Sequence, residues 1–275
     1  MRIRRDVVGE VLGTFVLVLL GCGSVAASVL FGAHRELLSG ALVWGVGAAL
    51  SIYLTRHLSC AHLNPAVTLA MAASGRMAWR KVPTYLCSQF AGAFLAGLML
   101  YALFAPSIAA FEARHGIVRG SAASVATARM FGEYYPGPGD CARVTLPLAM
   151  GAEAFGTFLL VLMVFALTEG CNVGRPDDAL APVFIGLTVT SVICLIAPLT
   201  QAGLNPARDA GPRLVAWLAG WGAAAWPDRT GGAFLVYVLS PVAGAVAAAH
   251  FFVRLVEPAM RGSGTDCACG RGRSD

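Results

Sequence analysis

Six long apolar stretches constrain the fold of this chain more than any other feature of its sequence. A bilayer core is about 30 Å thick, so a helix needs roughly 20 mostly apolar residues to cross it. The stretches that meet this requirement cover residues 7–30, 39–55, 83–104, 146–168, 180–198 and 232–254. Only 13% of the residues are charged, against about 25% in a soluble domain. The sequence therefore predicts an all-α membrane protein with six transmembrane helices.

The first apolar stretch raises the alternative of a cleaved signal peptide. It follows Arg2, Arg4 and Arg5, and basic residues before an apolar run are typical of such signals. The run is long for a signal, it carries Glu10, and it has a copy further along the chain. A retained helix is therefore the preferred interpretation.

The distribution of basic residues predicts the orientation. Most lie in the connections on one side if six helices alternate, and by the positive-inside rule that side is the cytoplasm. We therefore expect an integral protein of the inner or plasma membrane with both termini cytoplasmic. Arg114, Arg119, Arg129 and Arg143 in the connection 105–145 weaken this asymmetry. Because the net charge of +5 is spread over many short loops, we expect lipid rather than nucleic acid as a partner.

The eight cysteines do not indicate a disulfide framework. Cys22, Cys87 and Cys194 fall inside predicted helices, where cysteine behaves as a small apolar residue. Cys267 and Cys269 lie in a Gly-, Ser- and Arg-rich tail, residues 257–275, that we expect to be disordered. A C-x-C pair without a nearby histidine is weak evidence for metal, so no metal or cofactor is expected.

An internal repeat divides the chain into two halves. Residues 9–19 match residues 152–162 at an offset of 143, and Leu63–Ala66 recurs as Leu204–Ala207 at an offset of 141. The first repeat covers about residues 7–104 and the second about 146–256, and together they form a single domain, residues 1–256. Three spans separate the two copies of the short motif, so the second half is inverted relative to the first. Inverted repeats are common in transport proteins, with the site where the halves meet.

The repeated motif predicts two helices that enter the membrane without crossing it. Asn is a preferred N-cap and Pro is favoured at the first helical position, so each Asn-Pro-Ala begins a helix. The runs that follow, residues 67–74 and 208–217, are too short to span, because about 11 residues reach about 16 Å. With the halves inverted, the two half-helices point their N-termini at each other near the midplane. The motif residues are Asn64, Pro65, Ala66, Asn205, Pro206 and Ala207.

This arrangement has a specific electrostatic consequence. Two helix N-termini, each carrying roughly +0.5 charge, repel cations where they converge. The amides of Asn64 and Asn205 would donate hydrogen bonds to a passing water or polyol, which would interrupt a proton-conducting water chain. The segments 58–63 and 200–204 before each motif can line the path with carbonyl oxygens.

Six spans, two Asn-Pro-Ala motifs and an Arg directly after the second motif resemble the major intrinsic protein (aquaporin) family. The segment 205–213, Asn-Pro-Ala-Arg-Asp-Ala-Gly-Pro-Arg, and the segments 59–68 and 115–121 are similar to its glycerol-facilitator (aquaglyceroporin) branch. The resemblance covers about residues 7–256. It implies an aquaporin-like fold, a homotetramer, and one pore per protomer for glycerol and related small neutral solutes, with some water.

The resemblance also implies a selectivity filter. Arg208 corresponds to the guanidinium that donates hydrogen bonds to hydroxyls, and Trp44 to the aromatic wall beside the carbon atoms of glycerol. The sequence departs from the branch at two filter positions. Ala202 stands where a second aromatic is usual, and Ile193, or Cys194 if the alignment slips by one, stands where Gly is usual. The filter is then either reshaped, with a bulkier side chain of the fifth span standing in for the missing ring, or simply wider than is usual in the branch.

Four further residues are expected to support the site. Glu10 and Glu153 occupy matching positions, and in the family each accepts N–H groups from the bent loop before a half-helix. Asp209 is expected to orient a loop. His62 is expected to pack beneath the first half-helix rather than to bind metal, and it can present an edge to the pore.

Three functional hypotheses follow from these features. The preferred one is a passive channel that conducts glycerol and similar solutes while excluding protons and ions. The alternative is an ion-coupled secondary transporter, because acidic residues such as Glu10 and Glu153 inside a membrane can relay protons. An enzyme is disfavoured because the predicted helices carry no nucleophile with a base and no cluster of metal ligands.

Overall fold

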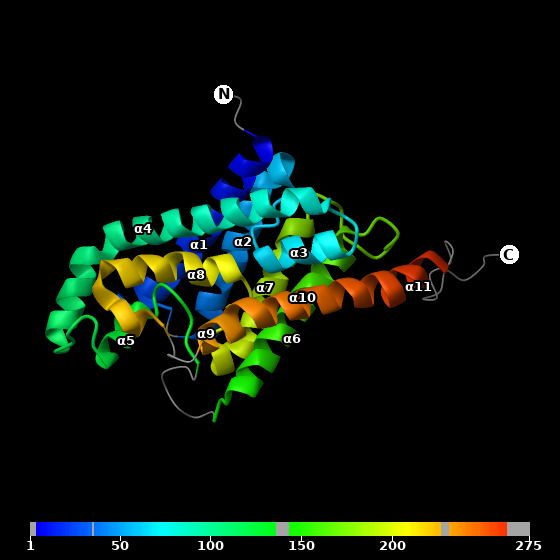
Figure 1. Cartoon of the computed structure of the whole chain (residues 1–275). Coiled ribbons are helices and arrows are strands. Elements are labelled where there is room, and N and C mark those ends of the chain that lie inside the picture. Colours follow the sequence, from blue (N-terminus) through cyan, green and yellow to red (C-terminus); the bar gives the residue numbers. More distant parts are fainter. Residues whose placement is uncertain (1–3, 35, 136–142, 227–230, 263–275) are drawn as a thin grey trace.

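The computed structural model describes residues 4–34, 36–135, 143–226 and 231–262, and in this part of the chain every regular element is helical (Figure 1). Six helical segments are long and apolar enough to cross a membrane, which confirms the six predicted spans. The long helices are α1 (Arg5–Phe31), α2 (Leu37–Ser59), α4 (Val82–Arg114), α6 (Leu146–Thr168) and α7 (Ala181–Thr200). The sixth span is continuous over α9 (Gly232–Phe234), η5 (Leu235–Leu239), α10 (Ser240–Phe251), η6 (Phe252–Val256) and α11 (Glu257–Gly262).

Two short helices begin at the repeated motif, as predicted. They are α3 (Pro65–Ala73) and α8 (Pro206–Ala216). The Oδ1 atom of Asn64 accepts from the backbone N–H of Ala66, and that of Asn205 accepts from Ala207 and Arg208. Figure 1 shows α3 and α8 end to end in the middle of the molecule, between α4 and α10.

Each half of the chain packs its short helix against the other half. In the first half α1 packs against α2 and α4, and in the second α6 packs against α7 and α10. However, α3 packs mainly against α10 of the second half, and α8 packs mainly against α4 of the first. The contact between α8 and α4 is close, because a Cβ added to Gly211 would lie 2.6 Å from the Cβ of Ala93. Each short helix is therefore held by the last long helix of the other half.

The halves also meet directly where α2 packs along α7. A Cβ added to Gly45 would lie 2.4 Å from the carbonyl oxygen of Gly186, and one added to Gly186 would lie 2.3 Å from that of Gly45. These two glycines are separated by 141 residues, the same offset as Asn64 and Asn205. Equivalent residues therefore touch each other at the centre of the inverted repeat, where only glycine allows the backbones to approach so closely.

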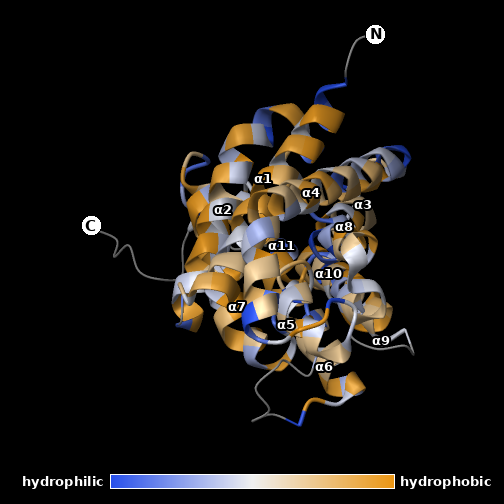
Figure 2. Cartoon of the chain, turned by 90° about the vertical axis from the view of Figure 1, so that its left-hand side faces the viewer, coloured by the Kyte–Doolittle hydropathy of each residue, from blue (hydrophilic) through white to orange (hydrophobic). Residues whose placement is uncertain are grey.

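The outer surface of the helices is apolar. Figure 2 shows hydrophobic residues along the outward faces of the long helices. Exposed examples on α2 are Leu38, Val46 and Leu50, which are 53–56% exposed. A surface of this kind is suited to lipid rather than to water.

Five short helical elements complete the connections in the described part of the chain. They are η1 (Trp79–Lys81) before α4, η2 (Ala122–Ser124) with α5 (Val125–Ala128) in the long connection, and η3 (Trp217–Trp221) with η4 (Gly222–Ala225) after α8.

Two helices are longer than the hydrophobic pattern predicts. The third span does not stop near residue 104 but runs through Pro106 to Arg114, because Ile108 is fully buried and Glu112 pairs with Arg119. The sixth span continues through α11 to Gly262, so the expectation that the tail from residue 257 is disordered is wrong for residues 257–262. An ion pair between Arg76 and Glu257 holds this extension to the connection that follows α3. Cys267 and Cys269 lie outside the described residues.

Candidate functional site

A cavity of about 450 Å³ passes between the two halves of the molecule. Its wall includes Trp44, Arg208, Arg76 and Asp178. Both motif asparagines and the loops that precede them line its middle. The cavity therefore follows the path on which the inverted repeat places the two half-helix N-termini.

The two asparagines connect the half-helices through crossed hydrogen bonds. Asn64 Nδ2 donates to the carbonyl of Leu204 at 2.9 Å, and Asn205 Nδ2 donates to the carbonyl of Leu63 at 2.8 Å. Because Oδ1 of each amide caps its own helix, the side chain fixes both its helix and the opposite loop. An amide nitrogen carries two N–H groups, so each asparagine has a second donor for a molecule in the cavity.

The loops before α3 and α8 adopt an unusual backbone. Six residues other than glycine have positive φ angles of 51° to 66°, and they occupy equivalent places in the two loops: Cys60, Ala61 and Leu63 in the first, and Gln201, Ala202 and Leu204 in the second. The left-handed region disfavours L-residues by about 1–2 kcal/mol each. Such loops persist only where the surrounding structure holds them.

Two buried carboxylates hold these loops. Glu10 accepts from the backbone N–H groups of His62 at 3.0 Å and Leu63 at 2.8 Å. Glu153 accepts from those of Gly203 at 2.8 Å and Leu204 at 2.7 Å. Both glutamates are fully buried. Matching acids thus satisfy matching N–H groups that would otherwise lack partners, which is the contact expected of them from the sequence.

The four residues expected to form the filter all line the cavity. The guanidinium carbon of Arg208 lies 4.2 Å from the centroid of the Trp44 ring. Ile193 and Ala202 also line the cavity, whereas Cys194 is absent from its wall. Ile193 therefore reaches the cavity, and its role in a filter stays a prediction.

A glycine on α1 makes room for the Trp44 ring. A Cβ added to Gly21 would lie 2.2 Å from two carbon atoms of that ring, which is far inside contact distance. The orientation of Trp44 in the cavity therefore depends on the lack of a side chain at Gly21.

Glu133 is a charged neighbour of Arg208 that no sequence pattern singled out. It forms an ion pair with Arg208, with side chains that are only 6% and 5% exposed. In the sequence Glu133 is one of three acids in the long connection, with Glu112 and Asp140, and no pattern distinguishes them. The signal that could have pointed to an acid such as Glu133 is that a buried arginine needs a nearby opposite charge.

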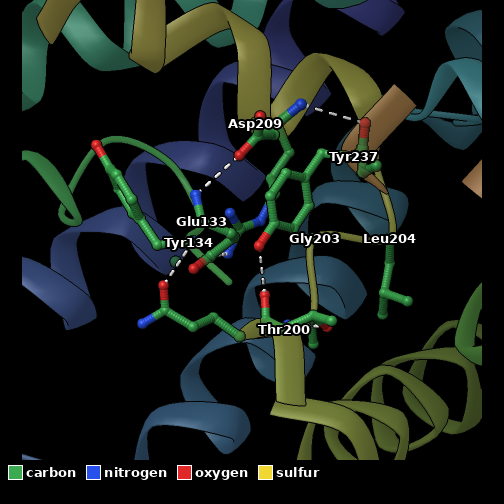
Figure 3. A network of polar contacts seen from close by, with 12 residues as sticks. Glu133, Tyr134, Thr200, Gly203, Leu204, Asp209 and Tyr237 are labelled. Atoms are coloured by element: carbon green, nitrogen blue, oxygen red, sulfur yellow. Dashed lines mark hydrogen bonds and ion pairs between the residues drawn. The ribbon is translucent and has the colours of Figure 1, made fainter. Parts of the chain in front are cut away.

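Asp209 and Arg213 on α8 hold the loop that carries Glu133, and Figure 3 shows the contact of Asp209 with Glu133. Asp209 Oδ1 accepts from the backbone N–H of Glu133 at 2.8 Å, and Arg213 donates to the Glu133 carbonyl at 2.5 Å. The two side chains also pair with each other. Asp209 thus orients a loop, and Arg213 is a second supporting residue that the sequence analysis did not identify.

The second bent loop is fastened in a similar way. The backbone N–H of Tyr134 donates to Gln201 Oε1 at 2.8 Å, and the Tyr237 hydroxyl donates to the carbonyl of Thr200 at 3.0 Å (Figure 3). The connection 129–135 therefore contacts both the half-helix α8 and the loop before it.

His62 lines the cavity in the first bent loop. Its ring packs against Tyr85 with 5.0 Å between ring centroids, and its Nδ1 lies 3.2 Å from Thr68 Oγ1. Among the described residues no group of three or more His, Cys, Asp or Glu side chains is placed to hold a metal ion.

Comparisons with known proteins agree with this geometry. Residues 1–252 match the family model described as major intrinsic protein. A glycerol uptake facilitator protein of Haemophilus influenzae is 38% identical over 272 residues, which cover 98% of each chain. A propanediol uptake facilitator of Citrobacter freundii is 37% identical over 258 residues, covering 92% of this chain and 93% of that protein. The structure of the aquaglyceroporin from Plasmodium falciparum has a TM-score of 0.81 at 24% identity, over 94% of this chain and 98% of that one.

Proposed function

Because the chain belongs to the major intrinsic protein family and is a passive channel for small neutral solutes, we propose that glycerol is its main solute and that the cavity between the halves is its pore. The observation that carries this proposal is the single cavity that runs from Arg208 past Asn64 and Asn205 to Arg76. Relatives named for glycerol and for propanediol uptake, each matched along nearly its whole length, support a short polyol.

The chemistry of the cavity wall suits such a solute. Trp44 and Ile193 offer an apolar surface to C–H groups, while Arg208 and the two asparagine amides offer donors to hydroxyl oxygens. The loops with positive φ angles supply carbonyl acceptors for hydroxyl hydrogens. Trp44, Ile193, Ala202 and Arg208 then act as the selectivity filter, and Ala202 with Ile193 sets its width.

The same wall explains how ions are excluded. The N-termini of α3 and α8 each contribute roughly +0.5 charge at the middle of the pore, and Arg208 adds a cation at the filter. Water molecules pass the asparagine amides one at a time. The amides orient each molecule so that it does not relay protons along the pore.

The apolar outer faces and the basic residues also bear on lipid contact, oligomeric state and orientation in the membrane. The apolar outer faces of the helices are suited to lipid contact and to association into a homotetramer. Both termini lie in the cytoplasm, in agreement with the distribution of basic residues.

A permeability panel tests the proposed solute. The protein is reconstituted in liposomes, and stopped-flow light scattering records uptake of glycerol, propane-1,2-diol, urea and water without any ion gradient. We expect glycerol and the diol to pass faster than in empty liposomes, at rates proportional to their concentration gradients. Uptake that required a proton or sodium gradient, or a panel in which glycerol did not exceed the empty control, would contradict the proposal.

Variants of the filter test the roles of its residues. Arg208→Ala is expected to admit larger or charged solutes, and Ala202→Phe is expected to slow the bulkier polyols relative to water. If neither variant alters the order of solutes, these residues do not form the filter, although the channel itself can still conduct glycerol.

A further inference from the structure

A second cavity, of about 390 Å³, lies at the end of the molecule where α1 and α4 begin. Its wall includes Arg4 and Arg5 at the start of α1 and Lys81 directly before α4, and all three residues are exposed. Asp6 is the one acidic residue among the described residues of the wall. Three basic residues and one acid leave an excess of two positive charges. The wall shares only Cys60 with the cavity between the halves.

The acid of this wall pairs with only one of the three cations. Asp6 accepts from Nη2 of Arg4 at 2.8 Å and from Nε of Arg4 at 3.2 Å. The ion pairs in the described part of the chain include neither Arg5 nor Lys81. Like charges that face a shared cavity repel each other, so an anion between them is favourable.

The neutral polar groups of the wall are already engaged by the loop before α3. The Tyr85 hydroxyl donates to the carbonyl of Ser59 at 2.5 Å, and the backbone N–H of Ala61 donates to Ser59 Oγ at 3.2 Å. Ser59 is in turn hydrogen-bonded to the buried Glu10 carboxylate. These contacts fix this side of the cavity. The strong donors that remain for a ligand are therefore the guanidinium and ammonium groups.

The cavity lies at the level where membrane helices meet the lipid headgroups. The apolar stretches of the two helices begin at residues 7 and 83, directly after the basic residues. Trp79, two residues before Lys81, is 60% exposed, and tryptophan is enriched at the interface between membrane and water. Basic pockets beside membrane helices at this level bind anionic headgroups.

We propose that this second cavity is a binding site for a phosphate group, held by Arg5, Lys81 and the N–H groups of Arg4 that Asp6 does not use. Guanidinium groups bind phosphate oxygens through paired hydrogen bonds, and an ammonium group adds a point charge. The phosphodiester of an anionic lipid and a free phosphate ion present the same kind of oxygens. Because the site lies outside the pore, it goes beyond the proposed function and holds for any solute.

Lipid binding tests the site directly. The protein in detergent is titrated with phosphatidylglycerol, and native mass spectrometry counts the lipids that each protomer retains. Phosphatidylcholine, whose headgroup has no net charge, is the comparison lipid, and it is expected to bind more weakly. In Arg5→Gln/Lys81→Gln protein the dissociation constant for phosphatidylglycerol is expected to rise about thirtyfold, the effect of removing two basic residues near a membrane surface.

The matched control removes two charges at the same end of the molecule but outside the cavity. Arg80 and Arg254 are exposed, and neither lines the cavity. The ion pair between Arg76 and Glu257 places the end of the sixth span beside the connection that precedes α4. Arg80→Gln/Arg254→Gln protein is therefore expected to bind phosphatidylglycerol like the wild type. Equal losses in both double variants would reveal a general attraction to the basic surface and would overturn the site.

A variant of Asp6 has the opposite expected effect. Asp6→Asn removes the acid of the wall and releases Arg4, so binding of phosphatidylglycerol is expected to tighten about fivefold, the effect of one charge near a membrane surface. Glu36→Gln is the control, because Glu36 is an exposed acid outside the cavity. Weaker binding by Asp6→Asn protein with a wild-type unfolding midpoint would contradict the proposal.

Inorganic phosphate distinguishes the two sources of the group. It is titrated into lipid-free protein in detergent against chloride at equal ionic strength, and ³¹P NMR follows its binding. Phosphate that binds and displaces phosphatidylglycerol would support a site open to free ions, whereas lipid binding alone would support a site for the lipid headgroup. Wild-type protein that neither prefers phosphatidylglycerol to phosphatidylcholine nor binds inorganic phosphate would overturn the proposal.

Discussion

Arg208 and Glu133 form an ion pair beside the cavity, although they come from different segments and both are almost completely buried. The other side of the Arg208 guanidinium faces the Trp44 ring. The guanidinium is therefore held between a carboxylate and an aromatic surface, and its position in the pore depends on a loop that precedes it by about a quarter of the chain.

Glu133→Gln is expected to impair both stability and transport. Removing one charge of a buried pair leaves the other uncompensated, which destabilises a protein by about 3 kcal/mol. Arg208 then turns toward water in the pore, so glycerol permeability falls. Thermal unfolding in detergent and stopped-flow uptake measure the two effects. The control is Glu112→Gln, which breaks an ion pair with Arg119 away from the cavity wall. Equal losses of permeability in both variants would contradict a specific role for Glu133.

Gly21→Ala is expected to change the order in which solutes pass. The new methyl group would occupy the space of the Trp44 ring, and overpacking of this kind also destabilises by about 1–3 kcal/mol. Gly23→Ala is the matched control on the same helix, because a Cβ there meets no atom within 4 Å. A permeability panel in which the two variants behave alike would show that Trp44 does not depend on Gly21.

Asn205→Asp is expected to let cations through the pore. The change replaces the donor to the Leu63 carbonyl with a carboxylate and places a negative charge where two helix N-termini repel cations. Sodium conductance in planar bilayers measures the effect. Asn172→Asp is a suitable comparison, because Asn172 makes the same kind of bond, to the Ala166 carbonyl at 2.8 Å, and is not part of the cavity wall. Absence of sodium current in Asn205→Asp protein would show that the helix dipoles alone are sufficient to exclude cations.

Glu153→Gln is expected to reduce stability by about 2 kcal/mol. A glutamine presents an N–H where the loop requires an acceptor, which leaves a buried backbone N–H without a partner. The unfolding midpoint in detergent measures this loss, with the exposed Glu36→Gln as control. A midpoint equal to that of the wild type would mean that the second bent loop keeps its shape without the Glu153 carboxylate.

Features that recur in the sequence were the ones that could be predicted. The motif copies specify two N-caps, two short helices and their opposed directions, because Asn and Pro act locally on the backbone. The matching acids Glu10 and Glu153 could be assigned a common task because they occupy matching positions in the two repeats and because the resemblance to the family implies that task. Apolar length was sufficient to find six spans, because the bilayer sets that length.

Features that depend on contacts between distant segments could not be predicted. Glu133 lies in a connection without periodicity, and only folding brings it to Arg208. The role of Gly21 arises from the direction in which the Trp44 ring points, which the sequence does not record. The third span continues past Pro106 because tertiary packing of Ile108 and Glu112 outweighs the helix-breaking effect of proline.

The packing of each short helix against the opposite half has a consequence for the way solute crosses the membrane. Carriers that expose a site first to one compartment and then to the other do so by rocking one repeat against its partner. Here α3 is packed on α10, α8 is packed on α4, and Gly45 touches Gly186 backbone to backbone. A rigid-body swing would have to break all three contacts at once. The frame therefore stays fixed during each crossing, and net flow follows the concentration difference alone in either direction.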